Sequence, residues 1–261
     1  MNIQKKENMI IVVLVITLIG VLTFGIIKDR KMKKDNVNDN EVSTLVDSTK
    51  EESKEETPAK EEKPVEEKND LYGKLKNKSD IRMLVLGDGL ALSQGKNTTA
   101  GAWDKGIANW ITNTYGSNVN LVSLAKPGAT SAVGVDVVSN NDISNYDLIV
   151  TCFGQNDNRN LVGINTFNTN YQAILDKIKE KNPNGIIIPL VPNTLVKDNA
   201  YKGAIEEIAQ KNNLKVVDMG VEFNNSGVSI NELLGNSGLP NDKGYGLYIN
   251  AVTKLIENSM K

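Results

Sequence analysis

Residues 83–90 read MLVLGDGL, a short apolar run that leads directly into a glycine-rich turn. Later runs share this pattern: each is rich in β-branched residues or leucine and is bounded by Gly, Asn, Asp or Pro, as buried strands typically are. We therefore expect strands over residues 83–86, 120–124, 148–153, 185–190 and 215–217.

Helical patterns separate these runs. Residues 103–115, 167–181, 201–212 and 245–258 are the segments that we expect to be helical. The second has apolar side chains on one face, at Phe167, Tyr171, Ile174, Leu175 and Ile178. Alternation of apolar strands and amphipathic helices predicts a doubly wound α/β domain with a mostly parallel five-stranded sheet. Such sheets bind ligands beyond the carboxyl ends of their strands.

Composition excludes several classes of function. The 261 residues carry a net charge of −2, so we expect no nucleic acid partner. Cys152 is the single cysteine, which excludes an intrachain disulfide and a cysteine-based zinc site. The chain has no histidine, the usual general base and metal ligand. We expect no metal and no cofactor.

The first 70 residues differ from the rest in composition. After a tail of residues 1–8, residues 9–27 form an uncharged apolar segment long enough to cross a bilayer as a helix. Residues 28–70 are rich in Glu, Lys, Ser and Thr and have little to bury, so we expect a disordered linker. A cleaved signal peptide is the alternative for residues 9–27, but no small-residue cleavage site follows them. Residues 71–261 form the predicted folded domain.

Unusual residues follow several of the predicted strands. Residues 87–90 read GDGL, residues 126–130 read KPGAT, and residues 154–157 read GQND. A fourth segment, residues 236–245, reads NSGLPNDKGY. In a parallel sheet the first three would meet at one edge.

In order and spacing, these four segments resemble the sequence blocks of the SGNH, or GDSL-like, hydrolase family. The resemblance extends from about Arg82 to the carboxyl terminus. It implies the family's fold, with a flavodoxin-like strand order, and a site for acyl groups at the sheet edge.

The resemblance also assigns positions, residue by residue. Gly89 occupies the position of the family's nucleophilic serine, in a block where Asp88 matches. Gly128 matches the glycine whose N–H binds the oxyanion, and Asn156 matches the asparagine that provides a second donor. Gly154 and Asp157 flank that asparagine as the family pattern requires, and we expect them, with Asp88, to support the pocket.

The last block departs from the family at both of its reactive positions. Pro240, Asn241, Asp242, Gly244 and Tyr245 fit its frame. This alignment places Asn236 where the family has aspartate and Leu239 where it has histidine.

Ester hydrolysis by this route requires a nucleophile, a base and a carboxylate that orients the base. Gly89, Leu239 and Asn236 provide none of them, so the sequence predicts a pseudoenzyme-like member of the family. The donors expected at Gly89, Gly128 and Asn156 remain, and they would suit a carbonyl or carboxylate ligand.

Simpler interpretations stay open. Residues 87–89 alone would be a tight turn, residues 156–157 a helix cap, and Leu239 ordinary core packing. Ser93 or Ser131 with Lys126 or Lys243 is a much weaker candidate for a substitute nucleophile and base. We expect Cys152 to be inert packing in a strand, and Trp103 and Trp110 to pack in the core.

These observations predict a membrane-anchored, catalytically inactive domain that binds an acylated glycan or a protein partner at the cell surface. A weak or atypical esterase or O-acetyltransferase and a structural element of a membrane complex are the alternatives. The basic residues that follow the apolar segment favour a cytoplasmic domain by the positive-inside rule. We expect an extracellular domain nevertheless, because family members joined to a membrane span commonly act on extracellular polysaccharides.

Overall fold

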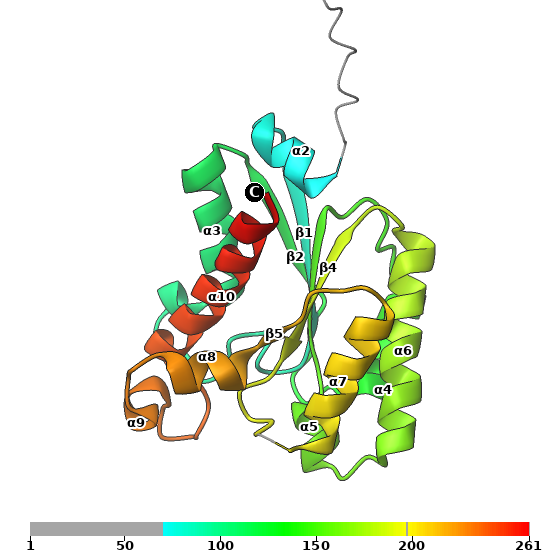
Figure 1. Cartoon of the computed structure of the whole chain (residues 1–261), viewed down its shortest axis with the longest axis vertical. Helices are drawn as coiled ribbons and strands as arrows, with labels where there is room; N and C mark the ends of the chain where they lie inside the picture. The colour runs from blue at the N-terminus through cyan, green and yellow to red at the C-terminus, as the bar shows by residue number, and fades with distance from the viewer. Residues whose placement is uncertain (1–69, 197, 261) are drawn as a thin grey trace, which may run out of the picture. The chain divides into compact units, whose positions relative to one another are not determined.

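A computed structural model describes residues 70–196 and 198–260 of the chain (Figure 1). The predicted N-terminal tail, the apolar segment 9–27 and residues 28–69 of the linker lie outside the described residues. Among the helices that the structure does describe, none combines the length and the apolar character needed to span a bilayer.

Five parallel strands form a single sheet in the order β2-β1-β3-β4-β5. The strands are β1 (Ile81–Gly87), β2 (Val119–Ser123), β3 (Leu148–Cys152), β4 (Ile186–Val191) and β5 (Val217–Asp218). In the register of the sheet, Met83 of β1 lies opposite Leu121 of β2 and Leu148 of β3. The parallel α/β class and the flavodoxin-like order that the sequence predicts are both confirmed.

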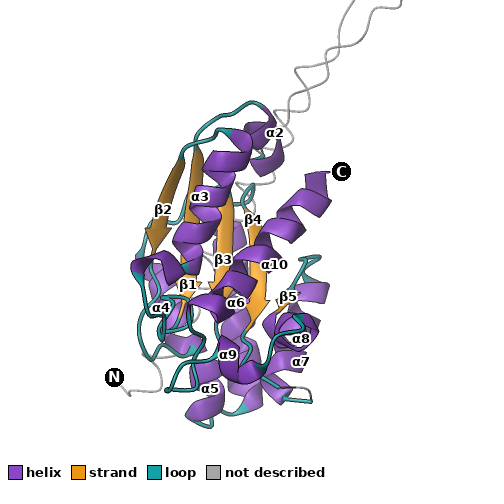
Figure 2. Cartoon of the chain, turned by 90° about the vertical axis from the view of Figure 1, so that its left-hand side faces the viewer, coloured by secondary structure: helices purple, strands orange, loops and turns teal. Residues whose placement is uncertain are grey.

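Helices cover both faces of the sheet (Figures 1 and 2). They are α2 (Leu71–Lys76), α3 (Trp103–Tyr115), α4 (Ser131–Asn140), α5 (Gln155–Arg159), α6 (Ile164–Lys181), α7 (Ala200–Lys211), α8 (Met219–Asn225), α9 (Ile230–Leu233) and α10 (Asp242–Met260), with a 3-10 turn η1 (Thr99–Gly101). The four helices that the sequence predicts correspond to α3, α6, α7 and α10.

Alternate residues of β1 point into two separate apolar cores. Met83 and Val85 pack with α2, α3, α8, α9 and α10, whereas Leu84 and Leu86 pack with α4, α6 and α7. Trp103 is buried in the first core, and Trp110 is partly buried against it, as the sequence predicts. The sheet is thus covered on both sides, which leaves the carboxyl ends of its strands and their loops as the natural place for a site.

Candidate functional site at the carboxyl edge of the sheet

The backbone at the end of β1 lies very close to the backbone at the end of β3. A Cβ atom on Gly87 would overlap the carbonyl oxygen of Cys152 and lie 2.7 Å from the Cβ of Ala91, so only glycine fits there. The next residue, Asp88, donates its N–H to the same Cys152 carbonyl at 3.2 Å. The first glycine-rich loop is therefore fastened to the end of β3.

Asp88 is completely buried and connects two of the predicted loops. Its Oδ1 atom accepts the N–H of Leu90 at 2.9 Å, and its Oδ2 atom accepts the side-chain amide of Asn156 at 3.1 Å. Burial raises the pKa of Asp88 to about 6, and the hydrogen bonds from Leu90 and Asn156 partly offset that rise. The bond to Asp88 uses one of the two amide hydrogens of Asn156 and leaves the other free for a ligand.

Asp157 fixes the loop after β3 to the start of α4. Its carboxylate accepts the backbone N–H of Ser131 at 3.0 and 2.9 Å and the hydroxyl of Ser131 at 2.6 Å. Thr130, the N-cap residue of α4, makes no side-chain cap bond, so Asp157 caps this helix from another element. The contacts of Asp157 thus hold the start of α4 and do not include Gly89, Gly128 or Asn156.

Gly128 lies in an exposed turn just before α4. It has a φ of 72°, in the region that favours glycine, and a Cβ atom added to it would meet nothing within 4 Å. The same loop is fixed to β1 by a hydrogen bond from the N–H of Lys126 to the carbonyl of Gly87 at 3.0 Å. Gly154, with a φ of 109°, makes the corresponding turn into α5.

These bonds bring the three predicted loops to one edge of the sheet. Asp88 contacts Asn156 directly, and the loop of Gly128 is joined to Gly87. Within residues 70–196 and 198–260, the backbone N–H groups of Gly89 and Gly128 donate no hydrogen bond. We call Gly89, Gly128 and Asn156 the donor cradle.

A side chain that sequence reasoning missed covers position 89. A Cβ atom on Gly89 would overlap the Oε1 atom of Gln94 and lie 3.1 Å from its Cδ. The Gln94 amide thus stands where the side chain of a nucleophilic serine would begin. Nothing in the composition or spacing of the GDGL turn indicates it, because the contact depends on how residues 90–95 fold back.

The fourth segment contacts that turn with an apolar residue. A hydrogen bond from Gly235 N–H to the Leu239 carbonyl, at 2.8 Å, and a bridge between Leu234 and Pro240 close its loop. Leu239 packs against the first apolar core, and a Cβ on Gly95 would lie 2.7 Å from its Cβ. Asn236 is exposed and forms no side-chain hydrogen bond within the described part of the chain. Leu239 therefore cannot accept a proton, and Asn236 does not orient a residue that could.

A family model for the GDSL-like lipase/acylhydrolase family matches residues 85–247, which is more than half of the chain. The chain belongs to this family. The match includes the GDGL turn, the donor cradle and the loop of Leu239. A search of curated protein sequences finds no match.

Solved structures of several esterases share the fold at low sequence identity. A two-domain esterase active on acetylated mannans matches with a TM-score of 0.60 and 17% identity over 72% of this chain and 52% of its own. This chain therefore spans about half the length of that protein. A psychrotrophic esterase from Pseudoalteromonas sp. gives a TM-score of 0.54 and 19% identity, over 69% of this chain and 99% of its own.

A third match also extends over nearly all of its own length. It is an acetyl xylan esterase from Geobacillus stearothermophilus, with a TM-score of 0.52 and 17% identity over 68% of this chain and 95% of its own. These likenesses establish a shared fold and do not transfer an activity to this chain.

The substitute nucleophiles of this GDSL-like domain serve structural roles. Ser93 is completely buried, and its hydroxyl accepts the N–H of Trp103 at 3.0 Å. Ser131 is completely buried and bonded to Asp157. Lys243 pairs with Glu232 at 3.2 Å. Cys152 is buried in β3, where burial raises the pKa of its thiol, so it is packing rather than a nucleophile.

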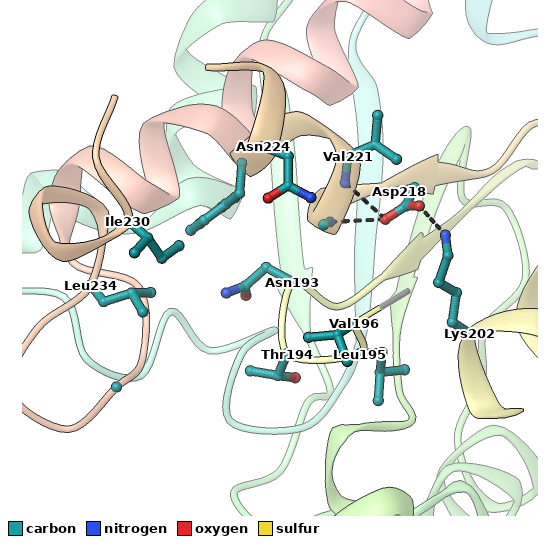
Figure 3. A pocket seen from close by; sticks show the side chains of 13 residues that line it. Asn193, Thr194, Leu195, Val196, Lys202, Asp218, Val221, Asn224, Ile230 and Leu234 are labelled. Atoms are coloured by element: carbon teal, nitrogen blue, oxygen red, sulfur yellow. Dashed lines mark hydrogen bonds and ion pairs between the residues drawn. The ribbon is translucent and has the colours of Figure 1, made fainter. Parts of the chain in front are cut away.

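The GDSL-like domain also has a cavity of about 440 Å³ beyond the ends of β4 and β5. Figure 3 shows Leu195, Val196, Val221, Ile230 and Leu234 around it, with the Lys202–Asp218 ion pair at one side. The cradle residues do not line it. Gly238 does line it, while the adjacent Leu239 contacts Gly95, so one loop borders both regions.

Proposed function

We propose that this domain is a non-hydrolytic member of the GDSL-like family that binds an acylated glycan at the cell surface. One observation carries the proposal: Gly89, Gly128 and Asn156 stand at the family's donor positions, while position 89 lacks a hydroxyl and position 239 holds a packed leucine. A cradle of donors without nucleophile or base can bind a carbonyl oxygen but cannot transfer its acyl group by the triad route.

The geometry of Asn156 supports the binding half of this proposal. Asp88 accepts one hydrogen of the amide and so determines which atom is nitrogen and where it lies. An amide oriented in this way loses little conformational entropy when a ligand binds. The Asn156 donor is therefore preorganised for an acceptor oxygen.

The location at the cell surface rests on the sequence. Residues 9–27 are uncharged and apolar, and residues 28–70 are polar and charged. A bilayer anchor followed by a solvated tether would display the domain at a distance from the membrane. Protease treatment of intact cells tests this: we expect loss of the domain before lysis, and a domain that stays intact until lysis contradicts an extracellular location.

The binding proposal is tested with the purified full-length chain and acetylated glucan oligosaccharides. We expect saturable binding by calorimetry and no acetate release by NMR. Asn156→Ala should abolish binding, whereas Asn160→Ala, an exposed neighbour at the end of α5, should leave it unchanged. Steady acetate release would support a weak or atypical esterase instead, and no binding of any acylated probe would refute the proposal.

One observation favours a second candidate, a protein partner. Val196, Val221 and Ile230 are 67%, 46% and 49% exposed, and all three border the cavity beyond β4 and β5. Clustered exposed apolar side chains mark interaction surfaces more often than isolated ones do. If Val221→Ser lowers recovery of a crosslinked membrane partner while glycan binding is absent, the partner-binding function is the better conclusion.

A further inference from the structure

Asp88 is a buried acid in direct contact with the donor cradle. One of its oxygens accepts the side-chain N–H of Asn156 at 3.1 Å, and the other accepts the backbone N–H of Leu90 at 2.9 Å. Within the part of the chain that the structure describes, no lysine or arginine forms an ion pair with Asp88. A buried carboxylate without a cation takes up a proton more readily than an exposed one does.

Titratable groups from two other elements face Asp88. Burial raises its pKa to about 6, and the nearby carboxylate of Asp157 in α5 adds a smaller rise. Cys152 of β3 and Tyr245 and Tyr248 of α10 also act on it, and burial raises the pKa of each of these three groups, so they stay uncharged near pH 6. The chain has no histidine, the side chain that most often titrates in this range.

Protonation of Asp88 changes the partner that it requires. An ionised carboxylate only accepts hydrogen bonds, whereas a protonated carboxyl group also donates one through its O–H. The side-chain oxygen of Asn156 accepts no hydrogen bond from any other described residue, so the amide can turn by 180° and offer that oxygen to the new donor. After this turn, an oxygen lone pair of Asn156 points where its second N–H pointed before.

We propose that Asp88 is a proton switch for the cradle: the ionised carboxylate orients Asn156 with its N–H toward the ligand, and protonation reverses the amide and weakens binding. This inference rests on the proposed function and adds a regulation of the same site. A ligand carbonyl would face the oxygen of the reversed amide, acceptor against acceptor. Loss of one hydrogen bond and that repulsion correspond to at least a tenfold weaker affinity of the protonated form.

The direction of the pH dependence follows from linkage. Because the ligand binds the ionised form more tightly, binding lowers the pKa of Asp88 and releases protons near pH 6. The dissociation constant should be nearly constant above about pH 7 and about five- to tenfold larger at pH 5. Protonation of Asp88 favours the folded state, so this loss of affinity is not a consequence of unfolding.

The test uses the purified full-length chain and acetylated glucan oligosaccharides, which carry no titratable group. Calorimetry gives dissociation constants from pH 5 to pH 8 for wild type, Asp88→Asn and Asp136→Asn, an exposed carboxylate on α4 that serves as the matched control. We expect wild type and Asp136→Asn to lose affinity in parallel as the pH falls. Asp88→Asn should bind weakly and equally at every pH. Circular dichroism at each pH verifies that all three proteins are folded.

A second measurement requires only wild type. At pH 6, titrations in two buffers that differ in their enthalpy of ionisation give the number of protons exchanged for each ligand bound. We expect the release of roughly 0.4 to 0.5 proton, because about half of the free chains carry the proton on Asp88 at this pH. Uptake of protons, or no exchange, contradicts the switch.

Each other outcome has a defined consequence. Equal affinity of wild type at pH 5 and pH 8, tighter binding at pH 5, or a pH response that survives in Asp88→Asn overturns the switch and leaves the proposed function standing. Absence of binding at every pH overturns both proposals.

Discussion

Asp88 places a carboxyl group in the interior without a cationic partner among its hydrogen bonds. Leu90 and Asn156 donate to it, yet burial raises its pKa from 3.8 to about 6. The folded state therefore holds this proton more tightly than the unfolded state does. Stability should fall as pH rises from about 4 to about 6, because ionisation is then more costly in the folded chain.

Asp88→Asn should remove this pH dependence. The shift of about two pH units corresponds to about 3 kcal/mol. As the pH rises from 4 to 7, the unfolding free energy of wild type should therefore fall by about that much relative to the unfolding free energy of Asp88→Asn. Urea denaturation across this range measures the difference, with Asp136→Asn, an exposed carboxylate on α4, as the matched control. Parallel curves for Asp88→Asn and wild type would contradict a raised pKa at Asp88.

The same substitution should weaken ligand binding. The side-chain nitrogen of an asparagine at position 88 would face the amide nitrogen of Asn156, two donors in contact. Rotation of Asn156 relieves this contact but turns its oxygen toward the cradle, where a ligand carbonyl would be repelled. We expect at least a tenfold loss of affinity for acylated oligosaccharides, measured by calorimetry, and unchanged affinity would show that Asn156 is not a donor to the ligand.

Individual residues also show where sequence reasoning reaches its limit. The positions of Gly89, Asn156 and Leu239 follow from the resemblance of the four segments to the family's sequence blocks, and those of Gly89 and Asn156 come directly after predicted strands. Gln94 could not be found in this way. Its contact with Gly89 depends on a turn fixed by Ser93, Tyr245 and Leu239, which are distant in sequence or have no motif of their own.

At the scale of elements, Asp157 joins α5 to α4. Removing it leaves Ser131 N–H and hydroxyl without their acceptor at a buried helix start. Asp157→Ala should lower the unfolding free energy by roughly 3 kcal/mol, whereas Asp136→Ala on the exposed side of α4 should change it by less than about 0.5 kcal/mol. Chemical denaturation checks both, and a small effect of Asp157→Ala would mean that water replaces the carboxylate.

The sequence predicted some helices and strands correctly and missed others. The buried strands β1 and β3 and the amphipathic helices α6 and α10 follow from apolar patterning, because burial dictates the side chains that face each core. The short helices α5, α8 and α9 were not predicted. Helices of this length are marginal alone and depend on tertiary contacts, such as those of the buried Met219, Phe223 and Leu233.

For the whole molecule, the decisive question is whether the scaffold is still competent for hydrolysis. Two loops would have to cooperate, since a triad requires Gly89→Ser in one and both Asn236→Asp and Leu239→His in the other. A serine introduced at position 89 would overlap the far end of the Gln94 side chain, which would have to move aside before the hydroxyl could react. The triple variant should therefore show little turnover of a chromogenic acetate ester.

Adding Gln94→Ala to the triple variant should free that space. We expect kcat/KM at least about a hundredfold above the triple variant, within the range that a positioned acid–base group contributes. Wild type and the single variant Gln94→Ala, which lack nucleophile and base, should both stay at background. Leu239→His replaces apolar packing against Gly95 and should cost about 1–2 kcal/mol, so each variant is first checked for folding by circular dichroism. If the quadruple variant folds and is no more active than the triple, Gln94 does not block the nucleophile position, and the loop of Leu239 has lost the geometry that a base requires.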